Sequence, residues 1–355
     1  MDLDRRRFGQ LAGALAVGAL VGAGRPVSAA AAADDPLRLV APELRPAVRA
    51  MLARPQLVFS DATLPQIQAN AVQAMAAPAA FLPIVPVTAE KVAVRIGRDD
   101  VLVYVINARP GTSRPAIVYM HGGGFVGGTA KGQVSRFQAL AAELDCAIVS
   151  VEYHLAPDAR YDTAIEETYA ALKWLYRNAD QLGVDRRRIA VMGESAGGTH
   201  AATLAFTARD RGEVPVMFQL LVYPALDDRT ASTHKLPPHL GAIGWGPESH
   251  RFAWRCYLGM APGGPGSPIA AIPARRNDLA GLPPAWIGVG SIDLLAPEAL
   301  DYARRLTEAG VPTELDLVPG AFHGFDKAPN DIPLVDRFNQ AKTVALRRAF
   351  DQAAG

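Results

Sequence analysis

The sequence predicts an α/β fold in which a mostly parallel sheet carries helices on both faces. From residue 116 onward, short apolar runs alternate with stretches of helical periodicity, the pattern of repeated strand–helix units. The apolar runs are nearly continuous, as is typical of parallel strands buried on both faces. Because ligands of such sheets bind beyond the carboxyl ends of the strands, the residues that follow each strand are the candidates for function.

The composition is that of a globular protein. Of the 355 residues, 50% are hydrophobic and 20% are charged, which excludes a disordered chain, a collagen-like repeat and a long coiled coil. Lys and Arg number 36 against 35 Asp and Glu, so no basic excess favours nucleic-acid binding. Two cysteines, Cys146 and Cys256, are too few for a disulfide scaffold, and we expect two buried free thiols.

Residues 1–33 have the features of an export signal. The twin arginine of Arg5-Arg6-Arg7-Phe8 precedes a short apolar run over residues 11–20 and an alanine-rich end. This resembles a bacterial twin-arginine signal, so we expect cleavage and a periplasmic or secreted protein. The second possibility is an uncleaved N-terminus that anchors the chain in the membrane. No later segment is long and apolar enough to span a membrane.

The remaining elements can be assigned in order. Residues 34 to about 79 are rich in alanine and proline and predict short helices at 46–52 and 65–75. Alternating apolar residues then predict a β-hairpin of strands 91–96 and 101–106. Further strands are expected at 116–120, 147–151, 188–192, 218–223, 285–289 and 313–318, and helices at 134–144, 161–182, 196–208, 297–309 and 334–349. A Pro- and Gly-rich stretch that ends at about residue 282 interrupts this alternation.

A serine motif follows the strand at 188–192. The residues Gly193-Glu194-Ser195-Ala196-Gly197 form G-x-S-x-G between a strand and a helix. In this arrangement a sharp turn holds the serine hydroxyl out of the sheet at a helix N-terminus, and glycines are needed beside it for lack of space. Ser195 is therefore the predicted nucleophile; the plainer interpretation is a Gly-Ser turn.

A glycine run, His121-Gly122-Gly123-Gly124-Phe125, follows the strand at 116–120. Glycines here let backbone N–H groups approach a developing oxyanion, as acyl-transfer enzymes of this architecture require. The run lacks the Gly-Lys-Ser/Thr of a phosphate-binding loop and the Gly-x-Gly-x-x-Gly of a dinucleotide loop. His121 is expected to brace the loop rather than to act as a base.

A base and an acid should accompany the serine. Of seven histidines, His323 is the best placed, because it lies in the loop after the strand at 313–318. The acid should follow the preceding strand, where Asp293 stands. The chain order Ser, Asp, His is that of triads built around a G-x-S-x-G elbow. The alternatives are a solvent-exposed loop histidine and an aspartate that caps a helix.

Taken together, these segments resemble the hormone-sensitive-lipase family of α/β-hydrolases, also called bacterial family IV esterases. The resemblance runs from about residue 92 to residue 350 and rests on Tyr119–Phe125, Tyr153–Pro157, Gly193–Gly198, Leu221–Pro224, the strand ending in Asp293, and His323–Phe325. It implies an α/β-hydrolase core of residues 91–226 and 283–355. A helical cap would be built from residues 34–90 and from an insertion at 227–282.

The resemblance also implies a role for each site residue. Ser195 would be the nucleophile, His323 the base and Asp293 the acid, with oxyanion N–H groups from Gly123, Gly124 and Ala196. The chain departs from the family at His154, where arginine is usual, at Glu194, where aspartate is commoner, and at Pro297, which replaces a second aspartate. None of these departures removes a member of the triad.

The predicted function is that of a serine carboxylesterase acting on small, short-acyl esters through an acyl-enzyme. Arylformamidase, other amidase or carbohydrate-ester deacetylase activity on the same triad stays open, and the intact triad disfavours a non-catalytic binding protein. Phe125, Glu194, Trp245 and Phe252 are expected to line the substrate pocket. No metal or organic cofactor is implied, and a homodimer is left open.

Overall fold

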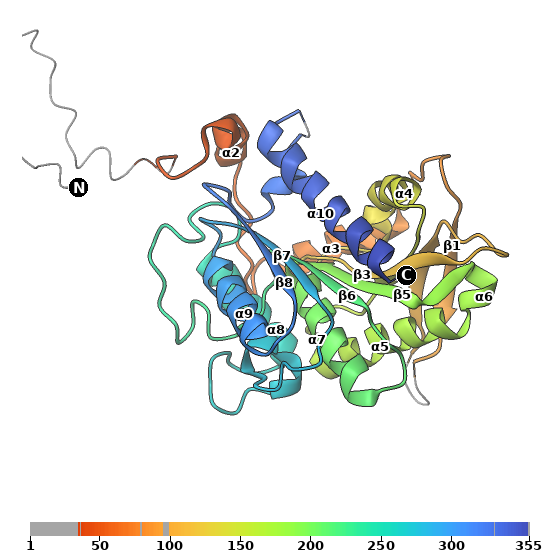
Figure 1. The fold of residues 1–355 in the computed structure, drawn as a ribbon. Coiled ribbons are helices and arrows are strands. Elements are labelled where there is room, and N and C mark those ends of the chain that lie inside the picture. The colour runs from red at the N-terminus through yellow and green to blue at the C-terminus, as the bar shows by residue number, and fades with distance from the viewer. Residues whose placement is uncertain (1–34, 36, 79, 95–98, 330, 354–355) are drawn as a thin grey trace, which may run out of the picture.

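The computed structural model describes residues 35, 37–78, 80–94, 99–329 and 331–353. Within these residues, eight strands form one sheet in the order β1-β2-β4-β3-β5-β6-β7-β8 (Figure 1). β2 pairs antiparallel with β1 and with β4, and the other neighbouring strands are parallel. The predicted mostly parallel sheet is therefore confirmed. The predicted export signal at 1–33 lies outside the described residues.

The strands follow the apolar runs of the sequence. They are β1 (Val87–Val92), β2 (Val101–Ile106), β3 (Arg114–Met120), β4 (Ala147–Glu152), β5 (Val184–Glu194), β6 (Phe218–Val222), β7 (Ala285–Gly290) and β8 (Thr313–Val318). β3, β6 and β7 are buried along their whole length, which explains why they carry no polar face. β1 starts four residues earlier than predicted, because Val87 already pairs with Ile106.

Helices cover both faces of the sheet. The α-helices within the described residues are α2 (Arg45–Leu52), α3 (Leu64–Ala76), α4 (Val134–Glu143), α5 (Tyr161–Arg177), α6 (Ala179–Leu182), α7 (Ala196–Arg211), α8 (Pro247–Leu258), α9 (Ala296–Glu308) and α10 (Pro333–Gln352). Figure 1 shows α4 and α10 on one face and α5, α7 and α9 on the other. Proline in the first turn marks the start of α8 and α10, and left-handed Gly212 and Gly259 end α7 and α8.

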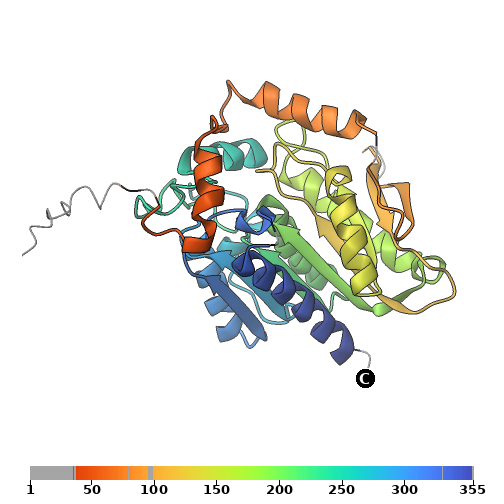
Figure 2. The ribbon, with the colours of Figure 1, turned by 90° about the horizontal axis from the view of Figure 1, so that it is seen from above.

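In the view of Figure 2, α2, α3 and α8 lie toward the same side of the molecule. The Phe59 amide donates to Ser249 Oγ at 2.9 Å, and Arg255 pairs with Asp61 at 2.6 Å, so the N-terminal segment and the insertion are in contact. A buried apolar cluster that includes Phe125 and Trp254 joins α8 to the core. The division into core and cap stays a prediction. Among the described residues, no helix has the length and apolarity needed to cross a bilayer.

Candidate active site

Ser195 occupies the sharp turn between β5 and α7. Its backbone angles are φ 56° and ψ −120°, a conformation that is costly for a residue with a side chain. The turn leaves no room at its glycines, because a Cβ at Gly193 would lie 1.9 Å from the carbonyl oxygen of Gly197. The Ser195 amide donates to the Val222 carbonyl at 2.9 Å, and the Ser195 carbonyl accepts from the Ala225 amide at 3.1 Å. The end of β6 therefore fixes the turn.

Ser195, His323 and Asp293 form one hydrogen-bonded chain. His323 Nε2 lies 2.9 Å from Ser195 Oγ, and His323 Nδ1 lies 2.8 Å from Asp293 Oδ2. The Asp293 side chain is completely buried, and its Oδ1 accepts from the Leu295 amide at 2.9 Å. A carboxylate held in this way favours the tautomer with the proton on Nδ1, which leaves Nε2 to accept a proton from the serine. The three residues follow β5, β7 and β8.

The glycine loop after β3 lies against this turn. Gly123, Gly124 and Phe125 all have positive φ, at 135°, 60° and 65°. A Cβ at Gly122 would lie 3.4 Å from the Cβ of Ser195, so the loop approaches the nucleophile closely. Within the part of the chain that the structure describes, the amides of Gly123, Gly124 and Ala196 have no hydrogen-bond partner. Three N–H groups of this region are therefore unpaired among the described residues, and their predicted role as oxyanion donors stays a prediction.

Two aromatic rings cover the glycine loop. A Cβ at Gly124 would lie 2.6 Å from Trp245 Cη2 and 3.1 Å from Phe59 Cε2. The two rings pack edge to face with centroids 5.1 Å apart, and the Trp245 centroid lies 6.1 Å from that of His323. Trp245 Nε1 donates to His250 Nδ1 at 3.1 Å, which holds the indole in place. Sequence reasoning singled out Trp245 but missed Phe59, because no motif surrounds it.

The other residues predicted to line the substrate pocket make different contacts. Phe125 stacks on Tyr257 with centroids 4.2 Å apart, inside the buried cluster beneath α8. The ring centroid of Phe252 lies 5.1 Å from the guanidinium carbon of Arg255. Glu194 is buried and accepts from Arg136 Nη2 of α4 at 2.6 Å. These contacts are not to the triad, and the pocket role of the three residues stays a prediction.

Three further histidines are buried near the site. Burial lowers the pKa of His121 to about 4, of His200 to about 3 and of His250 to about 3, so all three are neutral at neutral pH. The His121 ring stacks on Tyr153 at 4.3 Å, and its Nδ1 lies 2.9 Å from the Gly122 carbonyl oxygen. His121 thus braces the glycine loop. Among the described residues, no three His, Cys, Asp or Glu side chains are grouped to hold a metal ion.

His154 stands where the resembled family has arginine. Its Nδ1 lies 2.5 Å from Glu167 Oε1, and its amide donates to Glu167 Oε2 at 2.9 Å. The imidazole thus pairs with a buried carboxylate of α5. Although histidine replaces the usual arginine at position 154, the buried Glu167 carboxylate therefore still has a partner. Both cysteines are buried and free, as predicted.

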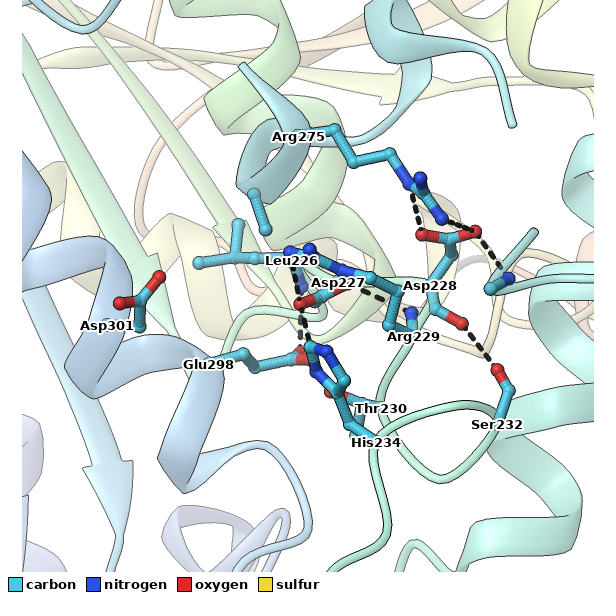
Figure 3. Close-up of polar contacts among 12 residues, drawn as sticks. Leu226, Asp227, Asp228, Arg229, Thr230, Ser232, His234, Arg275, Glu298 and Asp301 are labelled. Carbon is cyan, nitrogen blue, oxygen red and sulfur yellow. Dashed lines mark hydrogen bonds and ion pairs between the residues drawn. The ribbon is translucent and has the colours of Figure 1, made fainter. Parts of the chain in front are cut away.

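The insertion begins in a buried polar network, shown in Figure 3. Asp228 accepts from Arg275 Nε and from Ser267 Oγ, both at 2.7 Å. Asp227 accepts from Arg229 Nε at 2.8 Å. Asp228 lies near the start of the insertion and Arg275 near its end. Their hydrogen bond therefore joins the two ends of this segment.

Glu298 of α9 forms hydrogen bonds with the start of the same segment. Its Oε1 accepts from the Leu226 amide at 2.8 Å, and its Oε2 lies 2.5 Å from Thr230 Oγ1 (Figure 3). Complete burial raises the pKa of Glu298 well above its usual range, and the carboxylates of Asp227 and Asp293 raise it further. The hydrogen bonds with Thr230 and the Leu226 amide lower this pKa in part, and the net shift is upward, toward the neutral carboxylic acid.

Glu298→Gln should increase the stability of the protein at higher pH relative to wild type. The folded protein holds the Glu298 proton more tightly than the unfolded chain, where the pKa is near 4.5. The contribution of Glu298 to wild-type stability should therefore fall as the pH rises above that value, whereas a glutamine does not titrate. We expect the Tm of the variant minus that of wild type to grow between about pH 5 and about pH 8. A constant difference across this range would show that Glu298 does not hold a proton.

Comparison with known proteins agrees with the fold. Residues 117–327 match a family described by the alpha/beta hydrolase fold, and this range contains Ser195, Asp293 and His323. Esterase LipI of Mycobacterium tuberculosis is 38% identical over 241 residues, which cover 66% of this chain and 72% of LipI. Carboxylesterase NlhH of the same organism is 37% identical over 243 residues, covering 66% of this chain and 74% of NlhH.

Solved structures of esterases are similar over nearly the whole described chain. A bacterial heroin esterase superposes with a TM-score of 0.79 at 33% identity, over 88% of this chain and 99% of that one. Esterase LipW from Mycobacterium marinum superposes with a TM-score of 0.74 at 35% identity, over 88% of this chain and 97% of LipW. The chain therefore belongs to the α/β-hydrolase fold family, within its hormone-sensitive-lipase-like esterases.

Proposed function

We propose that this carboxylesterase-type hydrolase cleaves small esters through an acyl-enzyme on Ser195. The observation that carries the proposal is the hydrogen-bonded chain from Ser195 Oγ to His323 Nε2 at 2.9 Å and from His323 Nδ1 to Asp293 Oδ2 at 2.8 Å. Relatives named as an esterase and a carboxylesterase support the reaction class. Hydrolysis of a small ester by the purified protein, lost in Ser195→Ala, is the direct test.

In the acylation half, His323 Nε2 accepts the Ser195 proton while Oγ forms a bond to the ester carbonyl carbon. The carbonyl oxygen becomes an oxyanion, which the amides of Gly123, Gly124 and Ala196 stabilise. The N-terminus of α7 adds a favourable dipole at this point. As the tetrahedral intermediate collapses, the bond to the alcohol oxygen breaks and His323 gives that oxygen its proton.

In the deacylation half, water replaces the alcohol. His323 accepts a proton from water as its oxygen bonds to the acyl carbon, and the same three amides hold the second oxyanion. The bond to Ser195 Oγ then breaks, and His323 returns the proton to the serine. The products are a carboxylic acid and an alcohol. Asp293 keeps its hydrogen bond to Nδ1 throughout and stabilises the imidazolium that forms at each step.

Chain-length preference follows from the rings over the glycine loop. Each buried methylene adds about 0.8 kcal/mol, or about fourfold in kcat/KM, so rates should first rise with acyl length. They should fall once the acyl chain meets Trp245 and Phe59, which lie against Gly124. We expect kcat/KM to be highest at hexanoyl or shorter in a series from acetyl to palmitoyl esters of one alcohol. Formamides and acetylated sugars, assayed beside this series, test the alternative substrate classes.

Trp245→Ala should move this maximum to longer acyl chains, because it opens the space beside Gly124. Tyr176→Ala removes a ring of α5 that contacts Arg186 instead, and should leave the maximum in place. A wild-type maximum at decanoyl or longer, or activation at an oil–water interface, would show a true lipase and contradict the short-acyl proposal.

The N-terminal sequence supports export of the protein by a twin-arginine route. We expect a mature chain that begins between Ala30 and Asp35 and lies in the periplasm or outside the cell. Replacing Arg5 and Arg6 by Lys should retain the protein inside the cell, measured by fractionation and by the mass of the exported chain. An unchanged exported yield would refute this route, and a full-length protein in the membrane fraction would indicate an uncleaved anchor.

A further inference from the structure

A buried tyrosine, Tyr223, contacts the ring of His323, the proposed base. Tyr223 directly follows β6 and is 1% exposed. Its ring centroid lies 4.6 Å from that of His323, with the two planes at 62°. Because protein interiors are closely packed, an edge-on contact at this distance limits how far the imidazole can turn.

The hydroxyl of this tyrosine is fixed by a buried ion pair. Tyr223 Oη donates to Asp326 Oδ1 at 2.8 Å, and Lys342 Nζ donates to Asp326 Oδ2 at 2.8 Å. The Asp326 side chain is completely buried and that of Lys342 is 9% exposed. Asp326 lies three residues after His323, and Lys342 is on α10. Three side chains thus connect α10 to the imidazole.

The backbone around Tyr223 also holds the nucleophile. The Val222 carbonyl accepts from the Ser195 amide, and the Ala225 amide donates to the Ser195 carbonyl. Tyr223 itself has φ 34°, and its amide donates to the Gly288 carbonyl at 2.6 Å. A residue with a side chain keeps positive φ only where its surroundings determine it. Tyr223 is therefore fixed relative to both Ser195 and His323.

We propose that Tyr223 is a positioning residue, whose ring keeps His323 aligned between Ser195 and Asp293 and is itself held by the Asp326–Lys342 pair. This inference rests on the triad function proposed above. The imidazole must take a proton from Ser195 and pass it to the leaving oxygen without losing its bond to Asp293. A displacement of about 1 Å at such a group can cost about 10²-fold in rate.

Three variants test the ring and its anchor separately. Tyr223→Phe keeps the ring but loses the hydroxyl, and should lower kcat for an acetyl ester about 10-fold with KM within about twofold. Tyr223→Leu removes the flat ring and should lower kcat about 100-fold. Asp326→Asn combined with Lys342→Met removes the ion pair without leaving a lone buried charge, and should resemble Tyr223→Phe.

Two readouts separate positioning from a general loss of stability. In Tyr223→Phe, the pH profile of kcat/KM should differ from that of wild type, because the imidazolium is displaced from Asp293. The proton NMR signal of the His323 Nδ1–H, identified by its absence in His323→Gln, should shift or broaden in the same variant. This second readout needs no substrate.

Tyr302→Phe is the matched control. Tyr302 of α9 is also fully buried, and its hydroxyl has no hydrogen-bond partner within the described residues, so kcat and the NMR signal should stay unchanged. A Tyr223→Leu protein with wild-type kcat and an unchanged NMR signal would overturn the positioning role of the ring, whatever its Tm. The same result for Tyr223→Phe would overturn the role of the hydroxyl and its ion pair. Activity retained in Ser195→Ala would instead refute the proposed function, and the NMR comparison would then decide the inference.

Discussion

Ser195→Ala should lower kcat/KM for a short-acyl ester by about 10⁴-fold or more while the protein stays folded. The substitution removes the oxygen that lies 2.9 Å from His323 Nε2 and leaves the backbone of the turn unchanged. His323→Ala should be similarly severe, because a neutral serine hydroxyl is a weak nucleophile without a base. Initial rates of the purified variants with an acetyl ester measure both losses, and thermal unfolding checks that each variant is folded.

The double variant distinguishes a triad from two independent contributions. Since Ser195 and His323 act in the same proton transfer, losing both should cost little more than losing one. Ser135→Ala is a control, because the Ser135 hydroxyl donates to the Ala80 carbonyl at the surface of α4 and should leave the activity unchanged. Losses that multiply in the double variant, or an active Ser195→Ala, would contradict the proposed mechanism.

The sheet could be predicted because its strands are apolar along their length. Errors arise where polar residues belong to a strand. β5 begins at Val184 rather than 188, since Val184 pairs with Arg114 although three arginines follow it. The helix expected at 161–182 is interrupted at Asn178, whose Nδ2 donates to the Trp174 carbonyl at 2.8 Å. Such local side-chain bonds compete with the regular backbone pattern.

The proposed triad could be located from chain order, because in a parallel sheet the residues that follow neighbouring strands meet at one edge. The residues that surround the triad could not be predicted from the sequence. Phe59 reaches Gly124 only because a long N-terminal segment packs across the insertion, and no local periodicity encodes that contact. The stacking of Phe125 on Tyr257 in the buried cluster, at a φ of 65°, is likewise not indicated by any motif.

A second large effect is expected in the glycine loop. Gly124→Ala should lower kcat by about 10²–10³-fold, the usual cost of losing one oxyanion donor. Its Cβ would lie 2.6 Å from Trp245 Cη2, and its φ of 60° is unfavourable for alanine. Trp245 cannot easily yield, since Phe59 packs on it and His250 accepts its N–H. The loop would move instead, and with it the Gly124 amide that we propose as an oxyanion donor.

Trp245→Ala in the same chain separates these causes. If the ring displaces the loop, Gly124→Ala/Trp245→Ala should regain much of the kcat of Trp245→Ala alone, measured with an acetyl ester. Gly123→Ala should not be rescued, because its Cβ would lie 2.1 Å from the Gly127 carbonyl oxygen, which is backbone and does not depend on Trp245. A double variant no better than Gly124→Ala would assign the loss to the positive φ. A fully active Gly124→Ala would show that this amide does not stabilise the oxyanion.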